Sequence, residues 1–347
     1  MSIIYRKLLP VVILVAFSTL LACNSREEND NFPLLKGPYL GQKQPGMTAE
    51  IFAPDIISTG HAEKNGFFSP DGKEFYFLVF GEGASFIAFM RLEEKGWSQP
   101  HLAPFSGRYE DGEFSLSPDG NALYFTSNRP LAGTGKPEDY YNLWVVTRTK
   151  TGWSEPSSLD SSINTQDPDL FPHSPSVTSD GTLYFYFRTK DEQGNWDIYS
   201  SRLVEGRYTR PERLGDEINS DQWEFDPFIA PDESYLIFCS RAPGGYGASD
   251  LYISFREEDG SWTKALNLGD KVNSIRWEFC PCITPDGKYL FFASNRRFKL
   301  SQSETTMTFE AKIKFLDREL NSPGNGHSDF YWVDVKALEK LKPKKIR

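Results

Sequence analysis

Cysteine and histidine are scarce in this sequence. Its 347 residues include four cysteines and four histidines, and no two cysteines have the Cys-x-x-Cys spacing of a zinc site. Cys280 and Cys282 lie two residues apart on a predicted strand, so their side chains point to one face and are poorly placed to form a disulfide. We therefore expect buried free thiols at these positions and at Cys239, with no bound metal and no cofactor.

The sequence also has fewer basic than acidic residues. The chain has 38 lysines and arginines against 48 aspartates and glutamates, which gives a net charge of -10. An acidic protein repels phosphate backbones, and the sequence contains no large basic cluster that could offset this repulsion. We therefore expect no nucleic-acid partner.

An extended apolar segment occurs only at the N-terminus. Arg6 and Lys7 precede the apolar stretch 8–20, which is too short for a comfortable transmembrane helix and is followed by Leu-Leu-Ala-Cys ending at Cys23. This tetrapeptide resembles the lipobox of bacterial lipoproteins. The resemblance implies cleavage before Cys23, attachment of lipid, including palmitate, to this cysteine, and anchoring in the outer membrane. An ordinary signal peptide with an incidental cysteine is the alternative.

The chain divides into four segments. Residues 1–22 are predicted to form the lipoprotein signal peptide and residues 23–48 a disordered tether, because this polar stretch has too few apolar residues to offset its ordering entropy. Residues 49–336 are expected to form the folded domain and 337–347 a basic tail. Asn24 and the acidic residues behind it resemble sorting signals for the outer membrane or the cell surface, so the domain is expected to face the periplasm or the exterior.

Aromatic residues, glycine and proline are plentiful. The sequence has 16 Tyr, 27 Phe and 8 Trp beside 27 Gly and 23 Pro. Aromatic side chains favour pleated strands, whereas glycine and proline favour turns. This composition predicts an all-β protein.

A Ser-Pro-Asp-Gly corner recurs along the chain. It occurs at 69–72 and 117–120, with variants at 179–181, 231–233 and 284–287. Each corner is followed by an apolar aromatic run such as Phe75-Tyr76-Phe77 and then by a run usually opened by Asn or Asp. In the first four units a Trp-Ser-x-Pro type segment comes next. With the strand before the corner, each unit of about 50 residues has four short strands, as propeller blades do.

These units predict a single β-propeller of five blades. Over residues 50–336 they resemble the Pro-Asp-type, WD-like repeats of TolB-like periplasmic propellers and the repeats of outer-membrane OmpA-type lipoproteins. The fifth unit lacks a fourth strand, which residues 51–54 can supply, and this pairing would close the ring and remove two exposed edges. A sixth, degenerate blade within 24–60 is the alternative.

Loop lengths indicate where a site lies. The connections between blades, and between second and third strands, meet on one face, which also collects the long insertions 130–141, 241–249 and 297–328. Loops on a rigid scaffold carry function, so we expect a site at the channel mouth on this face. Residues 298–326 are expected to form either a lid over that mouth or a mobile loop.

Acidic residues recur seven positions before the corner proline, at Glu63, Asp111, Glu224 and Glu278, with Glu113 and Asp226 closer in. Arginines follow the second strands, at positions 129, 188, 241 and 296. One interpretation is a structural acid–arginine bridge that every blade needs. The other is a set of catalytic carboxylates in a glycan-active enzyme, namely Glu113, Glu224, Asp226 and Glu278, although the repeat shows no asymmetry of the kind catalysis requires.

Aromatic residues that depart from the repeat are candidate contacts. Trp223 and Trp277 precede acids, and Tyr109 and Tyr246 lie near the loop-rich face. They serve either as ligand contacts or as wedges between blades. The predicted binding face consists of these four residues with Arg129, Arg241 and Arg296. His173 has no convincing Ser or Cys partner in the sequence, which argues against a catalytic triad.

The sequence therefore predicts an outer-membrane lipoprotein, anchored through lipid at Cys23, whose propeller binds a protein or an envelope glycan. A glycoside hydrolase or lyase using channel-mouth carboxylates is the first alternative. A structural subunit of an envelope complex is the second.

Overall fold

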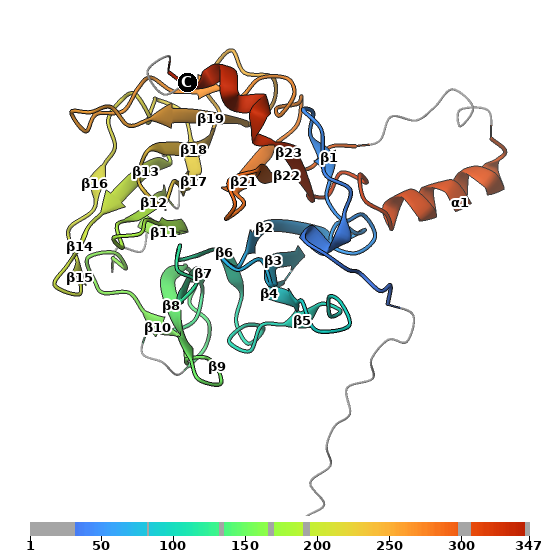
Figure 1. Cartoon of the computed structure of the whole chain (residues 1–347), viewed down its shortest axis with the longest axis horizontal. Helices are drawn as coiled ribbons and strands as arrows, with labels where there is room; N and C mark the ends of the chain where they lie inside the picture. The colour runs from blue at the N-terminus through green and yellow to red at the C-terminus, as the bar shows by residue number, and fades with distance from the viewer. Residues whose placement is uncertain are drawn as a thin grey trace, which may run out of the picture. The chain divides into compact units, whose positions relative to one another are not determined.

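The computed structural model describes residues 32–81, 83–131, 135–165, 170–189, 195–297 and 307–343. Cys23 and the predicted signal peptide lie outside these ranges, so the lipid anchor stays a prediction. Residues Leu34–Arg347 form one compact unit. Five antiparallel sheets surround a common axis in this unit, with β2, β6, β11, β17 and β21 nearest the middle (Figure 1). The predicted five-bladed propeller is confirmed.

The blades follow one another along the chain, and each has its first strand innermost. Blade 1 comprises β2 (Ala62–Phe68), β3 (Glu74–Gly81), β4 (Ala84–Arg91) and β5 (His101–Leu102). Blade 2 comprises β6 (Asp111–Leu116), β7 (Ala122–Ser127), β8 (Asn142–Thr149) and β10 (Ser157–Ser158), with β9 (Gly152–Trp153) paired to β8. Blade 3 comprises β11 (Leu170–Val177), β12 (Leu183–Thr189), β13 (Asp197–Ser201) and β16 (Glu212–Arg213), with the ribbon β14 (Leu203–Val204) and β15 (Arg207–Tyr208) between the last two.

Blades 4 and 5 complete the ring. Blade 4 comprises β17 (Glu224–Ile229), β18 (Tyr235–Ser240), β19 (Asp250–Phe255) and β20 (Leu266–Asn267). Blade 5 comprises β21 (Glu278–Ile283), β22 (Tyr289–Ser294), β23 (Asp329–Asp334) and, as its fourth strand, β1 (Glu50–Ile51). Two short 3-10 helices, η1 (Tyr39–Gly41) and η3 (Val335–Leu341), flank the ring in sequence.

The recurring corners join the first two strands of each blade through one hydrogen-bonding pattern. At the first corner the Asp71 carboxylate accepts from the Ser69 hydroxyl at 2.6 Å and from the Lys73 amide at 3.0 Å. Gly72 follows with a φ of 68°, a left-handed conformation that glycine adopts without a steric cost. The proline, aspartate and glycine of the motif therefore each satisfy a geometric need of the turn.

The ring closes as predicted, through an N-terminal strand. Glu50 pairs with Trp332 and Ile51 with Tyr331 across β1 and β23. Phe52 follows directly and is fully buried, with its ring 5.0 Å from that of Trp332 and 5.6 Å from that of Phe75. Because Phe75 belongs to blade 1 and Trp332 to blade 5, this one side chain joins the two ends of the ring.

The segment before the closing strand differs from the expected tether. Leu40 is fully buried, and the Tyr39 ring packs edge-on against Phe68 at 5.2 Å. The Trp97 indole donates to the Gly37 carbonyl at 2.8 Å. Residues 37–40 therefore contact the propeller, because these few apolar side chains find a partner surface that the local composition does not reveal.

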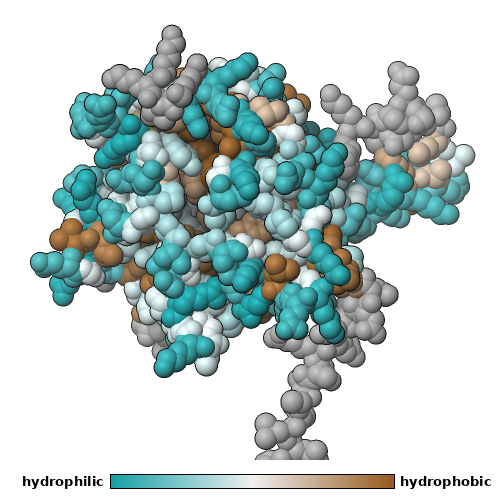
Figure 2. All heavy atoms as spheres, viewed as in Figure 1, coloured by the Kyte–Doolittle hydropathy of each residue, from teal (hydrophilic) through white to brown (hydrophobic). Residues whose placement is uncertain are grey.

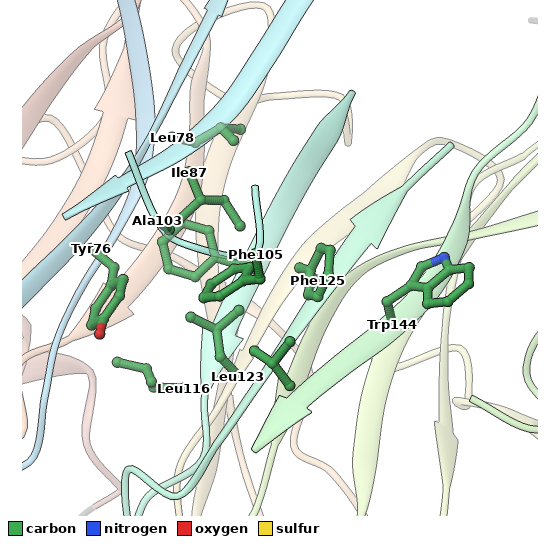
Figure 3. Packing of buried hydrophobic residues seen from close by; sticks show 11 residues of the cluster. Tyr76, Leu78, Ile87, Ala103, Phe105, Leu116, Leu123, Phe125 and Trp144 are labelled. Atoms are coloured by element: carbon green, nitrogen blue, oxygen red, sulfur yellow. The ribbon is translucent and has the colours of Figure 1, made fainter. Parts of the chain in front are cut away.

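Aromatic and aliphatic side chains fill the space between neighbouring blades. Between blades 1 and 2, Tyr76 and Leu78 of β3 belong to the same buried cluster as Phe125 of β7 and Trp144 of β8, and Phe105 of the connecting loop lies in the middle of this cluster (Figure 3). This interleaved packing makes each blade depend on its neighbours, which keeps the inner strands in fixed positions around the axis.

The insertion of blade 5 contains α1 (Phe309–Leu320), which starts at an N-cap formed by the Thr308 hydroxyl. The helix extends outward from the ring (Figure 1), and its exposed apolar side chains lie beside charged ones (Figure 2). The part of the insertion at 298–306 lies outside the described residues. None of the described helices is long and apolar enough to cross a membrane.

Candidate ligand-binding site at the channel mouth

In four of the five blades a recurring acid fastens the start of the inner strand to the preceding loop. The Glu224 carboxylate accepts from the Ser220 amide and hydroxyl, both at 2.8 Å, and from the Ser240 hydroxyl at 2.7 Å. The Glu278 carboxylate repeats this pattern with Ser274, four residues earlier, at 2.9 and 2.6 Å. Burial raises the pKa of Glu224 and raises that of Glu63 to about 7. These acids therefore fix the inner strand to the loop that leads into its blade.

Two of the recurring arginines complete these structural networks. Arg129 donates to Asp111 at 2.7 Å, and both side chains are almost fully buried. Arg296 likewise pairs with Glu278 at 3.2 Å. The acid–arginine bridge considered for every blade thus occurs in blades 2 and 5.

A second ring position, two residues after the recurring acid, contacts the neighbouring blades. It is occupied by Asn65, Glu113, Ser174, Asp226 and Cys280. Each inner strand has a β-bulge here, and four of these residues, all except Glu113, have φ between 48° and 54°. A bulge changes the direction of a side chain without ending the strand. At four of these positions the backbone is in the strained left-handed conformation, and residues at this position form hydrogen bonds with a neighbouring blade.

These side chains link the blades in sequence around the axis. The side-chain Oδ1 of Asn65 accepts from the Phe114 amide at 2.5 Å, which joins blades 1 and 2. Asp226 accepts from the Ser174 hydroxyl of blade 3 and, at 3.1 Å, from the Cys280 amide of blade 5. The remaining links are made by Glu113 with His173, at 3.6 Å, and by the Cys282 thiol with the Gly66 carbonyl, at 2.9 Å.

The two carboxyls of this ring have different electrostatic surroundings. Glu113 receives a hydrogen bond from the Lys64 ammonium at 2.5 Å. Although burial opposes it, this cation, aided by His173, lowers the pKa of Glu113 well below its usual range. Burial and then the Glu113 charge raise the pKa of Asp226. The pKa values of Glu113 and Asp226, at the bulges of β6 and β17, are therefore shifted in opposite directions. The repeat pattern of the sequence does not show this difference between two carboxyls.

A cavity of about 770 Å³ opens above these groups on the loop-rich side. Lys64, Glu113 and Asp226 contribute to its floor, and Gly326 to Ser328 contribute to its rim. Its aromatic and cationic lining consists of Phe80, Tyr186, Arg188, Trp196, Phe225, Trp277 and Phe279. No residue of α1 lines this cavity, so the helix of the blade 5 insertion does not cover it, whereas the end of the insertion reaches the rim at Gly326. Volume and lining match those of sites for small molecules or for the end of a polymer.

Aromatic and guanidinium groups stack in a row along one side of the mouth. The ring of Trp196 stacks on Tyr186 at 5.5 Å and on Trp223 at 4.1 Å. The Arg241 guanidinium then lies over Trp223 at 4.5 Å and over Trp277 at 5.5 Å. This Trp–Arg stack spans blades 3, 4 and 5 and forms a rigid wall with π faces and N–H donors.

The structure separates the residues predicted for the site. Trp277, Glu113 and Asp226 line the cavity, whereas Glu224 and Glu278 lie in the structural networks. Trp223 and Arg241 lie beside the cavity in the Trp–Arg stack, and Arg129 and Arg296 are held by acids. Tyr109 lies near Arg129 in a separate pocket, and Tyr246 is half-exposed at the surface.

Several residues that matter were missed. Lys64, Tyr186 and Trp196 were not among the predicted site residues, although Lys64 directly follows a recurring acid at a position where no other blade has lysine or arginine. A repeated Asn was missed as well: the Asn164 side chain accepts from the Leu143 amide, and Asn219 and Asn273 do the same in the next two blades. The repeated Ile/Val-Asn-Ser/Thr triplets in the sequence carry that signal.

Within the described ranges no group of three or more His, Cys, Asp or Glu side chains is arranged to hold a metal ion. Cys239, Cys280 and Cys282 are buried free thiols, and burial raises the pKa of each. The opposite end of the ring has a smaller cavity of about 270 Å³ that is lined by the corner loops.

The sheets, their order and the closing strand define a five-bladed β-propeller. No protein-family model matches the chain, and no curated protein sequence matches it. Similar solved structures include a TolB protein from Agrobacterium tumefaciens, with 18% identity, a TM-score of 0.44, and coverage of 79% of this chain and 90% of that one. They also include an alpha-L-arabinofuranosidase from Lactobacillus brevis, with 15% identity, a TM-score of 0.45, and coverage of 80% and 91%.

TolB from Acinetobacter baumannii is a third such structure, with 16% identity and a TM-score of 0.43 over 68% of this chain and 50% of that one. The predicted resemblance to TolB propellers is thus confirmed as a resemblance of fold. Functional conclusions rest on the cavity itself, because these similarities are too distant to carry one.

Proposed function

We propose that this protein is a glycan-binding propeller whose ligand enters the cavity at the channel mouth. One observation carries the proposal: the cavity joins an aromatic wall containing Trp196 and Trp277 to a charged floor containing Lys64 and Glu113. Sugars have both apolar C–H faces, which pack on aromatic rings, and hydroxyls, which need polar partners. A rigid ring with such a mouth binds without rearranging, which lowers the entropic cost of association.

The proposed location is the outer membrane, on its periplasmic or external side, with a lipid anchor at Cys23. This part of the proposal rests on the lipobox-like sequence before that residue. Cys23→Ala is expected to move the protein from the membrane fraction to the soluble fraction of the cells that produce it. Unchanged membrane partitioning of this variant would contradict the anchor.

The direct test of the proposed function is an array of envelope and host glycans probed with the purified protein. Binding is expected to weaken about tenfold or more in Trp277→Ala, because this ring lines the cavity. Tyr246→Ala is the matched control, since Tyr246 is an exposed aromatic outside the cavity. Absence of any glycan ligand, or equal loss in both variants, would contradict the proposal and favour a protein partner.

A second candidate is a glycoside hydrolase, which the unequal carboxyls of the floor favour. Asp226 with its raised pKa would protonate the leaving oxygen, while ionised Glu113 would take a proton from the attacking water. Asp226, however, already accepts hydrogen bonds from Ser174 and Cys280, which ties it to the ring structure. Shorter glycans, detected by mass spectrometry after incubation, would support hydrolysis, whereas unchanged glycans would contradict it.

A further inference from the structure

We propose that the ligand of this cavity is an anionic glycan and that Arg188 and Arg241 bind its acidic groups. The inference rests on the proposed glycan binding and specifies the class of sugar. The inference follows from a difference between blades at one position of the repeat, near the end of the second strand. This position is occupied by Asn128 in blade 2, Arg188 in blade 3, Arg241 in blade 4 and Asn295 in blade 5.

In blades 2 and 5 this position has a structural role. Asn128 of blade 2 accepts from the Glu110 amide at 3.0 Å, and Asn295 of blade 5 accepts from the Trp277 amide at 3.1 Å. In both cases the donor is the residue directly before the recurring acid. Asparagine here therefore satisfies a backbone N–H of its own blade.

Blades 3 and 4 have arginine at this position. Arg241 keeps the same backbone pairing, since its amide donates to the Trp223 carbonyl at 3.1 Å, as that of Asn128 does to Glu110 at 3.2 Å. A guanidinium has no acceptor, so its side chain cannot repeat the asparagine bond. Instead, Arg241 stacks on Trp223, and Arg188 stacks on Trp196 at 5.1 Å. These two blades replace a structural hydrogen bond with a cation at the mouth.

Neither stacked guanidinium has a carboxylate partner among the residues that the structure describes. Of the four recurring arginines, Arg129 and Arg296 form ion pairs, whereas Arg188 and Arg241 form none with any carboxylate in the described part of the chain. Stacking uses the faces of a guanidinium and leaves its in-plane N–H groups available. Those N–H groups match the two oxygens of a carboxylate or sulfate.

The floor of the cavity is compatible with an anion. Lys64 forms an ion pair with Glu113, which offsets the charge of that carboxylate, and burial followed by the Glu113 charge raises the pKa of Asp226. Arg188 lines the cavity, and Arg241 contacts Trp277, which lines it too. An acidic sugar stacked on the Trp wall would therefore meet cations at the rim of a protein whose net charge is -10.

The test compares two probes with one backbone, cellohexaose and its C6-oxidised glucuronan counterpart, and adds sulfated cellohexaose as a third. Titration calorimetry is expected to give tighter binding of an acidic probe, by about tenfold or more. That preference is expected to fall as salt is raised, since it is electrostatic. The acidic probe that binds more tightly, with carboxylate or with sulfate groups, identifies the kind of acidic group that the protein prefers in its ligand.

Arg188→Gln and Arg241→Gln are expected to weaken binding of the acidic probe about 10- to 100-fold, with little effect on the neutral one. Arg256→Gln is the matched control, because Arg256 also stacks on a tryptophan, Trp262 at 4.8 Å, but neither of these two residues lines the cavity. Arg188, in contrast, lines the cavity itself, and Arg241 contacts the lining residue Trp277. Equal affinity for acidic and neutral probes would overturn this inference and leave glycan binding intact. Failure of all three probes on a protein that binds other, neutral glycans overturns it as well, whereas failure on every glycan overturns the proposed function.

Discussion

Blades 2 and 5 use their arginine differently from blades 3 and 4. Arg129 and Arg296 are paired with buried acids, whereas Arg188 and Arg241 stack on tryptophans at the mouth of a cavity. A residue type that recurs in four of the five blades therefore need not have the same role in each of them. An arginine that recurs together with its acidic partner, such as Arg129 with Asp111, stabilises the ring. An arginine that recurs without such a partner among the described residues, such as Arg241, is available to bind a ligand.

The largest expected effect concerns the ring that both pairs of blades share. Deleting residues 1–60 removes β1 and the buried side chains of Leu40, Phe52 and Ile57. Since burying each such side chain contributes about 2–5 kcal/mol, we expect a loss of more than about 5 kcal/mol of unfolding free energy, measured by urea denaturation. Deleting residues 1–33, which precede the compact unit, is the control. Similar thermal midpoints for the two deletions would contradict closure by β1.

The next effect distinguishes the paired arginines from the stacked ones. Asp111→Ala leaves Arg129 buried without its carboxylate and is expected to cost about 3–5 kcal/mol. Urea denaturation of the variant measures this loss. A cost below about 1 kcal/mol would mean that the acid–arginine bridge does not maintain the blade.

A smaller effect is expected from pH at the closing seam. Burial raises the pKa values of Glu63 and Asp329 to about 7, whereas in the unfolded chain they lie near 4. The folded state therefore binds their protons more tightly, so this stability is full below pH 4 and is lost as pH rises through 7.

Asp329→Asn tests this pH dependence, because blade 2 has Asn142 at the same position, opposite the end of the second strand. The variant is expected to lose less stability between pH 4 and pH 7, by roughly 1–3 kcal/mol, in denaturation series across that range. Parallel curves for the variant and the wild type would contradict the assignment.

The smallest stability effect is expected at the stacked arginine itself. Arg241→Asn gives blade 4 the residue of blades 2 and 5, whose oxygen can accept from the Trp223 amide. Unfolding free energy is expected to stay within about 1 kcal/mol of wild type or to rise slightly. A loss of more than about 2 kcal/mol would show that Arg241 maintains the blade and would weaken its assignment to binding.

Much of the fold could be predicted from the sequence because its signals are local. A Pro-Asp-Gly corner specifies its own turn, so the positions of Asp71 and Asp119 predicted the strand pairs. The missing fourth strand of blade 5 predicted closure at residues 51–54, and β1 pairs at Glu50 and Ile51. The ordered contacts of residues 37–40 escaped prediction because they depend on a surface built by blades 1 and 5.

The candidate site was only partly predictable. Trp277 was identified because it is an aromatic residue that departs from the repeat, and Glu113 and Asp226 because each follows a recurring acid by two residues. Lys64 was missed because its partner Glu113 is 49 residues away in another blade. The four arginines were grouped by sequence position, yet a shift of one residue, between Asn128 and Arg129 in blade 2, separates the stacked position from the paired one.

Whether Arg241 binds the ligand can be decided by calorimetric titration of wild type and Arg241→Asn with oligoglucuronan and with cellohexaose, combined with urea denaturation of both proteins. The account predicts that the variant keeps its stability and its affinity for the neutral sugar but loses about tenfold or more in affinity for the acidic one. Full affinity of the stable variant for the acidic sugar would contradict the assignment of this arginine to ligand binding.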